Sequence, residues 1–170
     1  MDWFLTYSGL FFFGGAAGWV LELFFRRFVS QKKWVNPGFL TGPILPLYGF
    51  GLVGFYVFSN EIPWSSISSL TWLNTIIEIL CIGALMTAIE YIAGLIFIKG
   101  MKIKLWDYSN RWGNVQGIIC PLFSLIWLIV GCIYLFALNP FFVSFAGPDG
   151  WILNHSVGMT FVLGFFYGIL

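Results

Sequence analysis

Charged residues are the scarcest feature of this 170-residue sequence: Asp, Glu, Lys and Arg together make up 9% of it, whereas 59% is hydrophobic. A water-soluble domain of this length carries about a quarter charged residues, which keep its surface solvated. So few charges exclude a soluble globular protein and indicate a surface covered mostly by lipid. A cleavable signal peptide is not expected, because the start Met1-Asp2-Trp3 lacks a basic segment.

Several chemical motifs are also absent from the sequence. It has no Gly-rich phosphate loop ending in Lys-Ser or Lys-Thr, no Gly-x-Ser-x-Gly motif, and a single histidine, His155. Cys81, Cys120 and Cys132 lie singly in apolar runs, without the paired spacing of a metal or redox site. We therefore expect no catalytic residues, no metal, no cofactor and no nucleic-acid partner.

The sequence predicts an all-α integral membrane protein with about five transmembrane helices in a single polytopic domain, residues 1–170. Each apolar run can cross ~30 Å of hydrocarbon at ~1.5 Å per helical residue, and none alternates as a barrel strand does. The expected spans are residues 3–25, 39–58, 72–98, 117–138 and 151–170. The fifth is the weakest, because Asn154 and His155 interrupt it.

The basic residues predict the orientation of these spans. All eight lie in the loop between spans one and two or in the loop between spans three and four. The N-terminus and the other two loops hold Asp2, Glu61 and Asp149 and no Lys or Arg. Short basic loops stay in the cytoplasm, so we expect the N-terminus outside and the C-terminus inside.

The two basic hairpins resemble each other in sequence. In each, a helix with an acid, Glu22 or Glu90, leads into a basic loop with a Trp, and an Asn then stands seven residues before a Pro. The pairs are Asn36 with Pro43 and Asn114 with Pro121. Because both hairpins run inward and then back, they predict a parallel repeat.

Acids within apolar helices are candidates for function, since an ionisable group is costly at membrane depth. Glu22 lies one turn before Arg26, and the two can form an ion pair on one helix face. No opposite charge on its own helix can reach Glu90, so it must be protonated, hydrogen-bonded by another helix, or paired with Arg26 or Arg27. Glu78 lies nearer the outer edge, where we expect it to contact water.

Prolines shape the start of the second span. Pro43 and Pro46 should make this helix begin late or bend, because proline lacks a backbone donor. Irregular backbone at this depth is tolerated when it is buried in protein or lines a wet cavity. Together with Glu22, Glu90 and Pro121, the two prolines can border a polar cavity open to the cytoplasm. A structural kink packed by neighbouring helices explains them equally well.

The loop between spans three and four has two interpretations. Asp107 with Ser109 is typical of a turn or a helix cap. The same loop can also be a docking surface for a cytoplasmic partner, with Trp106, Asp107, Tyr108, Ser109 and Arg111 as candidates. Spacing alone does not separate a structural from a docking role.

Several of these motifs together resemble the bacterial ABC-transporter type IV membrane family. The motifs are Gly18-Trp19-Val20-Leu21-Glu22, the stretch from Asn36 to Gly49, Glu90-Tyr91, Leu105-Trp106-Asp107-Tyr108-Ser109 and Asn114-Val115-Gln116-Gly117. They cover about residues 18–131. Pro37 departs from the family pattern, in which a basic residue is expected there, and this weakens any anion-binding role for the loop.

The resemblance implies a permease component in a bacterial inner membrane, surrounded by membrane lipids, with a separate ATPase subunit supplying nucleotide chemistry. The chain is small for a complete transporter, so we also expect a homo-oligomer or a partner permease. The candidate polar site comprises Glu22, Arg26, Asn36, Pro43, Pro46, Tyr48, Glu90 and Asn114. Two alternatives stay open: a scaffold or regulatory subunit without transport, and an intramembrane enzyme that modifies lipids.

Overall fold

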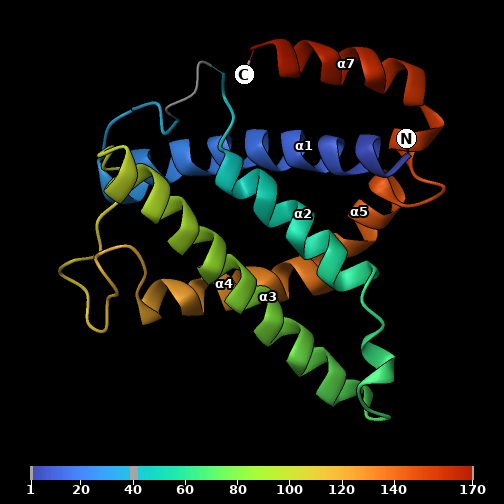
Figure 1. Cartoon of the computed structure of the whole chain (residues 1–170), viewed down its shortest axis with the longest axis horizontal. Coiled ribbons are helices and arrows are strands. Elements are labelled where there is room, and N and C mark those ends of the chain that lie inside the picture. The colour runs from blue at the N-terminus through green and yellow to red at the C-terminus, as the bar shows by residue number, and fades with distance from the viewer. Residues whose placement is uncertain (1, 39–41, 170) are drawn as a thin grey trace. The chain divides into compact units, whose positions relative to one another are not determined.

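A computed structural model describes residues 2–38 and 42–169, and every regular element in this part of the chain is a helix (Figure 1). The predicted all-α class is therefore confirmed. The helices are α1 (Asp2–Phe25), η1 (Arg26–Ser30), α2 (Pro46–Asn60), η2 (Trp64–Ser66), α3 (Thr71–Gly94), η3 (Leu95–Gly100), α4 (Pro121–Ile133), η4 (Tyr134–Leu138), α5 (Asn139–Ala146), α6 (Trp151–Asn154) and α7 (Ser156–Ile169).

Three stretches of the described residues are long and apolar enough to cross a bilayer: Trp3–Ser30, Thr71–Gly100 and Pro121–Asn154. They correspond to the first, third and fourth predicted spans. The helices in the second and fifth predicted spans are shorter, with 15 residues in α2 and 14 in α7. Five crossings and their orientation therefore stay predictions.

The second helix begins late, as its prolines predict. Residues 42–45 have no helical structure, and α2 begins at Pro46. Pro43 thus lies in the connection before the helix and does not kink it. The predicted start at residue 39 lies outside the described residues. Proline fits the first position of α2 because the first backbone N–H groups of a helix have no partner within it.

The fourth helix begins four residues later than expected, at Pro121, and its helical structure continues past residue 138. The π-helical segment η4 leads directly into α5, which contains Pro140. A π-helical turn relaxes the regular hydrogen-bond ladder, so it accommodates a proline that would otherwise break the helix. The Asn139-Pro140 pair therefore does not end the helix.

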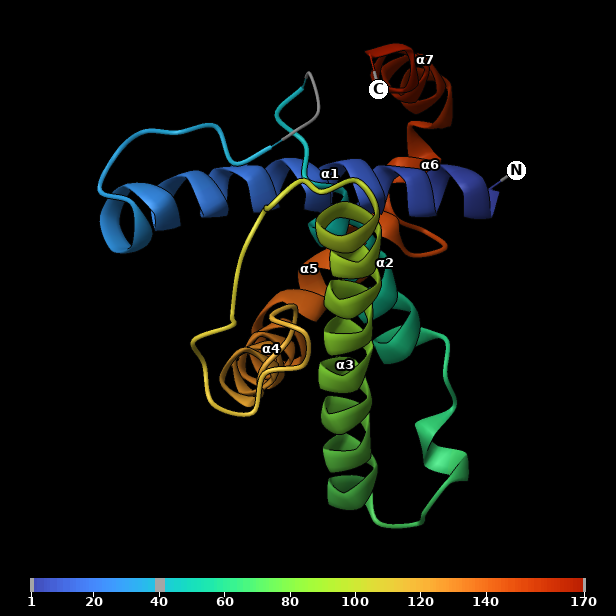
Figure 2. The same ribbon diagram turned by 60° about the vertical axis from the view of Figure 1, so that its left-hand side comes forward.

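The chain divides into two compact units, which we describe separately. Figure 2 draws the helices of both from a second side. Unit 1 comprises residues 1–53 and 140–170, and unit 2 comprises residues 54–139. This division does not test whether residues 1–170 form a single membrane domain, which stays a prediction.

In unit 1, glycines of α1 allow close packing of α2. A Cβ atom built on Gly14 would lie 2.7 Å from Leu52 Cβ and 2.8 Å from the Tyr48 carbonyl oxygen. A Cβ atom built on Gly18 would overlap the Tyr48 side chain. These distances leave no room for a larger residue, so the Gly14-xxx-Gly18 face is a packing face. Gly164 of α7, in contrast, has no neighbouring atom within 4 Å.

In unit 2, α3 and α4 pack antiparallel. Contacts pair Gly83 of α3 with Leu128 of α4, and Thr87 donates a hydrogen bond to Ser124 over 3.1 Å. As the residue number rises along α3, it falls along α4. The small side chains of α3 let α4 approach closely, which is the usual basis of helix packing in lipid.

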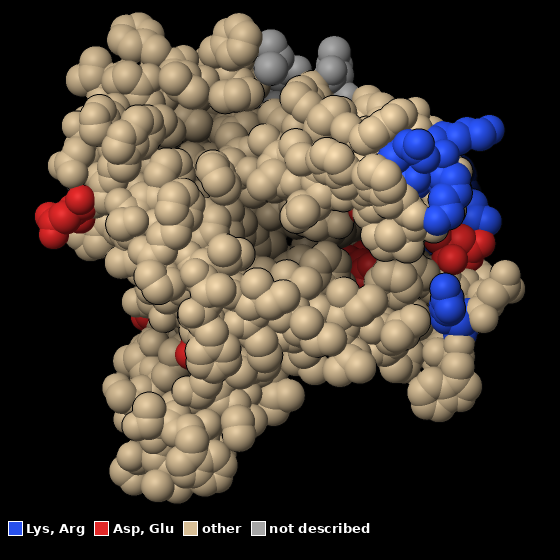
Figure 3. Space-filling model, turned by 180° about the vertical axis from the view of Figure 1, so that it is seen from behind, with Lys and Arg blue, Asp and Glu red and all other residues tan. Residues whose placement is uncertain are grey.

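The surface has the composition of a lipid-facing protein. On the face drawn in Figure 3, acidic and basic groups cover only small patches. Helix α7 exposes Val157, Phe161 and Phe165 by 74, 77 and 68%, in a stripe with helical spacing. In water such an exposed apolar stripe would favour aggregation, whereas the hydrocarbon of a bilayer solvates it.

Candidate functional site

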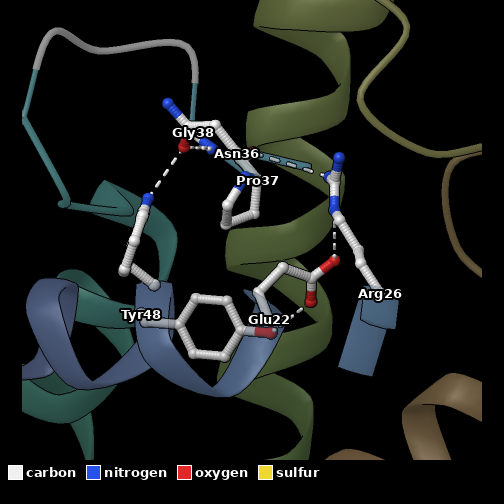
Figure 4. A network of polar contacts seen from close by, with 7 residues as sticks. Glu22, Arg26, Asn36, Pro37, Gly38 and Tyr48 are labelled. Atoms are coloured by element: carbon white, nitrogen blue, oxygen red, sulfur yellow. Dashed lines mark hydrogen bonds and ion pairs between the residues drawn. The ribbon is translucent and has the colours of Figure 1, made fainter. Parts of the chain in front are cut away.

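Glu22 anchors the polar network of unit 1 (Figure 4). Arg26 Nε donates to Glu22 Oε1 over 3.2 Å, which confirms the predicted ion pair one helical turn apart. The Tyr48 hydroxyl, from α2, donates to Glu22 Oε2 over 3.3 Å. Both carboxylate oxygens therefore have a partner, and the network joins α1 to the first turn of α2.

Asn36 organises the loop of this hairpin. Its Oδ1 accepts from Trp19 Nε1 over 2.8 Å and from the Gly38 backbone N–H over 2.9 Å. The Pro37 carbonyl accepts from Arg26 Nη2 at the longer distance of 3.5 Å. The loop is thus tied to α1 through Trp19 and to η1 through Arg26, on either side of Glu22.

Glu90 is the acid buried most deeply, with 5% of its surface exposed. The Tyr108 hydroxyl donates to Glu90 Oε1 over 2.9 Å, and Trp127 Nε1 donates to Oε2 over 3.0 Å. Of the alternatives open for this residue, the hydrogen bond from another helix is confirmed, since Trp127 belongs to α4. Both donors are neutral, so neither balances the charge of an ionised carboxylate.

The loop between η3 and α4 is folded onto these helices. Trp106 Nε1 donates to the Ile118 carbonyl over 2.8 Å, and the Tyr108 ring stacks on Phe123 with 4.2 Å between ring centroids. Of the five candidate docking residues, Tyr108 therefore faces the helices, and Trp106 closes the loop on itself. Arg111 is exposed, and its neighbour Trp112 is 86% exposed.

Asp107 forms the turn predicted for it. Its Oδ1 accepts from the Ser109 backbone N–H over 2.9 Å, and its Oδ2 lies 2.6 Å from Lys104 Nζ. The bond from Lys104, followed by those from Ser109, holds the pKa of Asp107 below its usual value. The structural interpretation of this part of the loop is thus confirmed, and its docking role stays a prediction.

The two hairpins share local geometry as well as sequence. Asn114 Oδ1 accepts from the Gly117 N–H over 3.0 Å, as Asn36 Oδ1 does from Gly38. Asn114 Nδ2 also donates to two loop carbonyls. In each hairpin the first long helix ends in a π-helical segment, η1 or η3. Each asparagine therefore accepts from the backbone N–H of a following glycine, two residues on in the first hairpin and three residues on in the second.

The candidate residues fall into both units. Glu22, Arg26, Asn36, Pro43, Pro46 and Tyr48 lie in unit 1, and Glu90 and Asn114 lie in unit 2. A single cavity bordered by Glu22 and Glu90 therefore stays a prediction. In unit 2, a groove is lined mainly by Leu80, Gly83, Ala84, Thr87, Ala88 and Leu128, and it is almost entirely apolar.

Sequence reasoning missed two features of unit 2. Trp127 donates a hydrogen bond to Glu90 from within an apolar helix. The sequence feature that could have indicated this is a tryptophan placed far from the membrane interfaces, where this residue type is usually found. Glu78, which we expected to contact water, has only 8% of its surface exposed, so that expectation is wrong. Among the described residues, no group of three or more His, Cys, Asp or Glu side chains could hold a metal ion.

A family model described as "Putative ABC-transporter type IV" matches residues 9–169. The match extends the resemblance seen in the motifs of residues 18–131 at both ends. No curated protein and no solved structure is similar enough to match the chain.

Proposed function

Since the chain belongs to the ABC-transporter type IV family, we propose that it is a permease component of a bacterial inner-membrane transporter, with a separate ATPase subunit as partner. The family relates the chain to membrane transport and names no substrate. The family name suggests the partner ATPase. The sequence itself has no phosphate loop ending in Lys-Ser or Lys-Thr, so we expect the nucleotide to be bound by that partner.

The observation that carries the proposal is the state of Glu90. The residue is 5% exposed and lies in a helix that is long enough to cross the membrane, and the donors that reach its carboxyl group from the described part of the chain are neutral. A carboxylate kept in this setting without a compensating charge is costly, so it is typical of a site for a cation, a proton or a polar substrate. Glu22 and Tyr48 are the matching groups of the first hairpin.

The proposed topology has five spans, with the N-terminus outside, the C-terminus inside and a parallel repeat of two hairpins. The basic loops support the orientation, and the similar closing of both loops by Asn36 and Asn114 supports the repeat. In this topology each hairpin carries its acid on the cytoplasmic side. Glu22 lies there with Pro43 and Pro46 in the first hairpin, and Glu90 lies there with Pro121 in the second.

The proposed contact with the ATPase is the outer surface of the loop between η3 and α4. Tyr108 fixes this loop to α3, and Trp106 closes the loop on itself through the Ile118 carbonyl, whereas Arg111 and Trp112 are exposed. An exposed arginine beside an exposed tryptophan is common in protein interfaces, where these residue types carry much of the binding energy. A second copy of the chain or a partner permease completes the transporter.

One observation favours the scaffold alternative. The carboxylate oxygens of Glu22 and Glu90 all have partners within the chain, as expected if these acids stabilise the hairpins. A lipid-modifying enzyme has less support, since it needs acids and donors that converge on a membrane-open cleft. The groove beside α3 and α4 is apolar instead.

Purification of the tagged protein in mild detergent tests the proposal. A stoichiometric ATPase should co-purify. The complex in vesicles should then show ATP-dependent transport of a candidate substrate. Glu90→Gln should abolish that transport without changing assembly, whereas Glu61→Gln, which removes an exposed acid, should leave it intact. Reproducible absence of an ATPase would instead favour the scaffold, and a changed lipid composition on deletion would favour the enzyme.

A further inference from the structure

Three buried side-chain oxygen atoms of unit 2 have no hydrogen-bond partner among the described residues: Ser59 Oγ, Asn74 Oδ1 and Glu78 Oε1. We call Ser59, Asn74 and Glu78 the α2–α3 oxygen cluster. Asn74 and Glu78 are each only 8% exposed, so water reaches them poorly. Buried polar atoms are nearly always paired in proteins, so three unpaired oxygens together require an explanation.

The three side chains belong to one place in the fold. Asn74 and Glu78 are four residues apart in α3 and so share a helix face. The Ser59 hydroxyl of α2 lies beside the Glu78 carboxyl. Asn74 Nδ2 donates to the Ser68 carbonyl over 2.9 Å, which fixes the amide and leaves its oxygen as the free acceptor.

The protein itself supplies no positive charge to this cluster from unit 2. The sequence has no Lys, Arg or His between Lys33 and Lys99. Lys99, the first basic residue of unit 2, follows Glu78 by 21 positions, or ~31 Å along a helix. A negative charge on Glu78 must therefore be balanced by something that is not part of unit 2.

We infer that the α2–α3 oxygen cluster binds a sodium ion. A cation among the three oxygens would be a common partner for all of them. The competing arrangement is a proton on Glu78 that is donated to Asn74 Oδ1 while the Ser59 hydroxyl donates to the carboxyl group, and a Na⁺ titration at constant pH separates the two. Hard cations prefer such oxygen ligands, and burial strengthens the attraction between the ion and the carboxylate.

The charge of the cluster argues for a monovalent ion. One carboxylate and two neutral oxygens balance a single positive charge, whereas sites for Ca²⁺ use six to eight oxygen ligands and commonly several carboxylates. Na⁺ is more costly to dehydrate than K⁺, but a charged carboxylate ligand favours it, because the smaller ion approaches the charge more closely and gains the larger Coulomb energy. The site is separated from Glu90 by 12 positions of α3, or ~18 Å.

Thermal unfolding of the purified full chain in detergent tests this site without requiring transport. NaCl is titrated against choline chloride at constant ionic strength and constant pH, with KCl as a second comparison. Because an ion that binds only the folded state stabilises it, we expect Na⁺ to raise the midpoint in a saturable manner, and more than K⁺ does. Glu78→Gln should raise the Na⁺ concentration that gives half of this shift at least about tenfold.

Two further variants keep the test decisive. Ser59→Ala retains the acid and removes one ligand, so it should weaken the Na⁺ response even if Glu78→Gln does not fold. Glu61→Gln removes an exposed acid two residues from Ser59 and should respond as the wild type does. An equal response to sodium and choline, or a full response in Ser59→Ala, would overturn the inference. A stabilisation that follows pH and ignores Na⁺ would assign a proton to Glu78 and would overturn it as well.

Discussion

Replacing Tyr108 by Phe isolates the hydrogen bond that Glu90 receives from the loop. Its hydroxyl donates over 2.9 Å to the carboxyl group of Glu90, a residue that is 5% exposed, and its ring stacks on Phe123. Phenylalanine keeps the ring stacking and removes only the donor. The change therefore leaves one oxygen of Glu90 without this partner while the packing of the loop is retained.

The stability lost in Tyr108→Phe depends on whether Glu90 is charged. A hydrogen bond to a charged group contributes about 1.5–3 kcal/mol, whereas a neutral one contributes about 0.5–1.5 kcal/mol. For an ionised Glu90 we expect Tyr108→Phe to lower the free energy of unfolding by at least about 1.5 kcal/mol, about tenfold in the unfolding equilibrium. A loss in the lower range would instead indicate a protonated Glu90.

Equilibrium unfolding in mixed detergent micelles, followed by circular dichroism, measures this difference. The control is Tyr91→Phe, because Tyr91 accepts a hydrogen bond from Gln116 at an exposed position, and its removal should cost within about 0.5 kcal/mol. The double variant with Glu90→Met, which removes the acceptor oxygens, completes a thermodynamic cycle. Equal effects of Tyr108→Phe and Tyr91→Phe, or additive effects of Tyr108→Phe and Glu90→Met, would refute the proposed bond.

Three further predictions concern packing, charge and topology. Gly14→Ala places a methyl group 2.7 Å from Leu52 Cβ and should cost about 1–3 kcal/mol of stability in the same unfolding assay, whereas Gly164→Ala should be neutral. Asp107 should titrate below its usual pKa of about 4, so its stabilisation of the loop is complete above that pH and is lost only on further acidification. Lys104→Met should move the carboxyl titration, followed by NMR, toward the usual value; an unchanged midpoint would contradict the ion pair. Trp112→Cys should react with a membrane-impermeant thiol reagent only from the cytoplasmic side, and labelling from outside would reverse the predicted orientation.

Local sequence rules predicted much of the helical structure and several of its details. Apolar runs without alternation specify helices in lipid, because a helix satisfies its own backbone hydrogen bonds. Pro46 predicted a late start for α2, and the spacing of Glu22 and Arg26 predicted their ion pair. Each of these features depends on residues within about one helical turn, so tertiary contacts had little to change.

Features that depend on contacts between helices could not be read from the sequence. The donors to Glu90 come from Tyr108 and Trp127, 18 and 37 residues away, and no local pattern relates these positions. Glu78 lies in the same helix as Glu90. Because it lies farther from the predicted membrane centre, we expected it to contact water, and its burial could not be read from the sequence.

The sequence by itself determined the helical class, the apolar surface and the local ion pair, because these follow from composition and from spacing along one helix. Only the tertiary structure decided which acids find donors and which do not. Helix packing brings Trp127 to Glu90, but it gives the buried oxygen of Glu78 no partner in the described chain. The burial of a side chain is a property of its neighbours, and that difference between two acids of one helix lies in what packs against each of them.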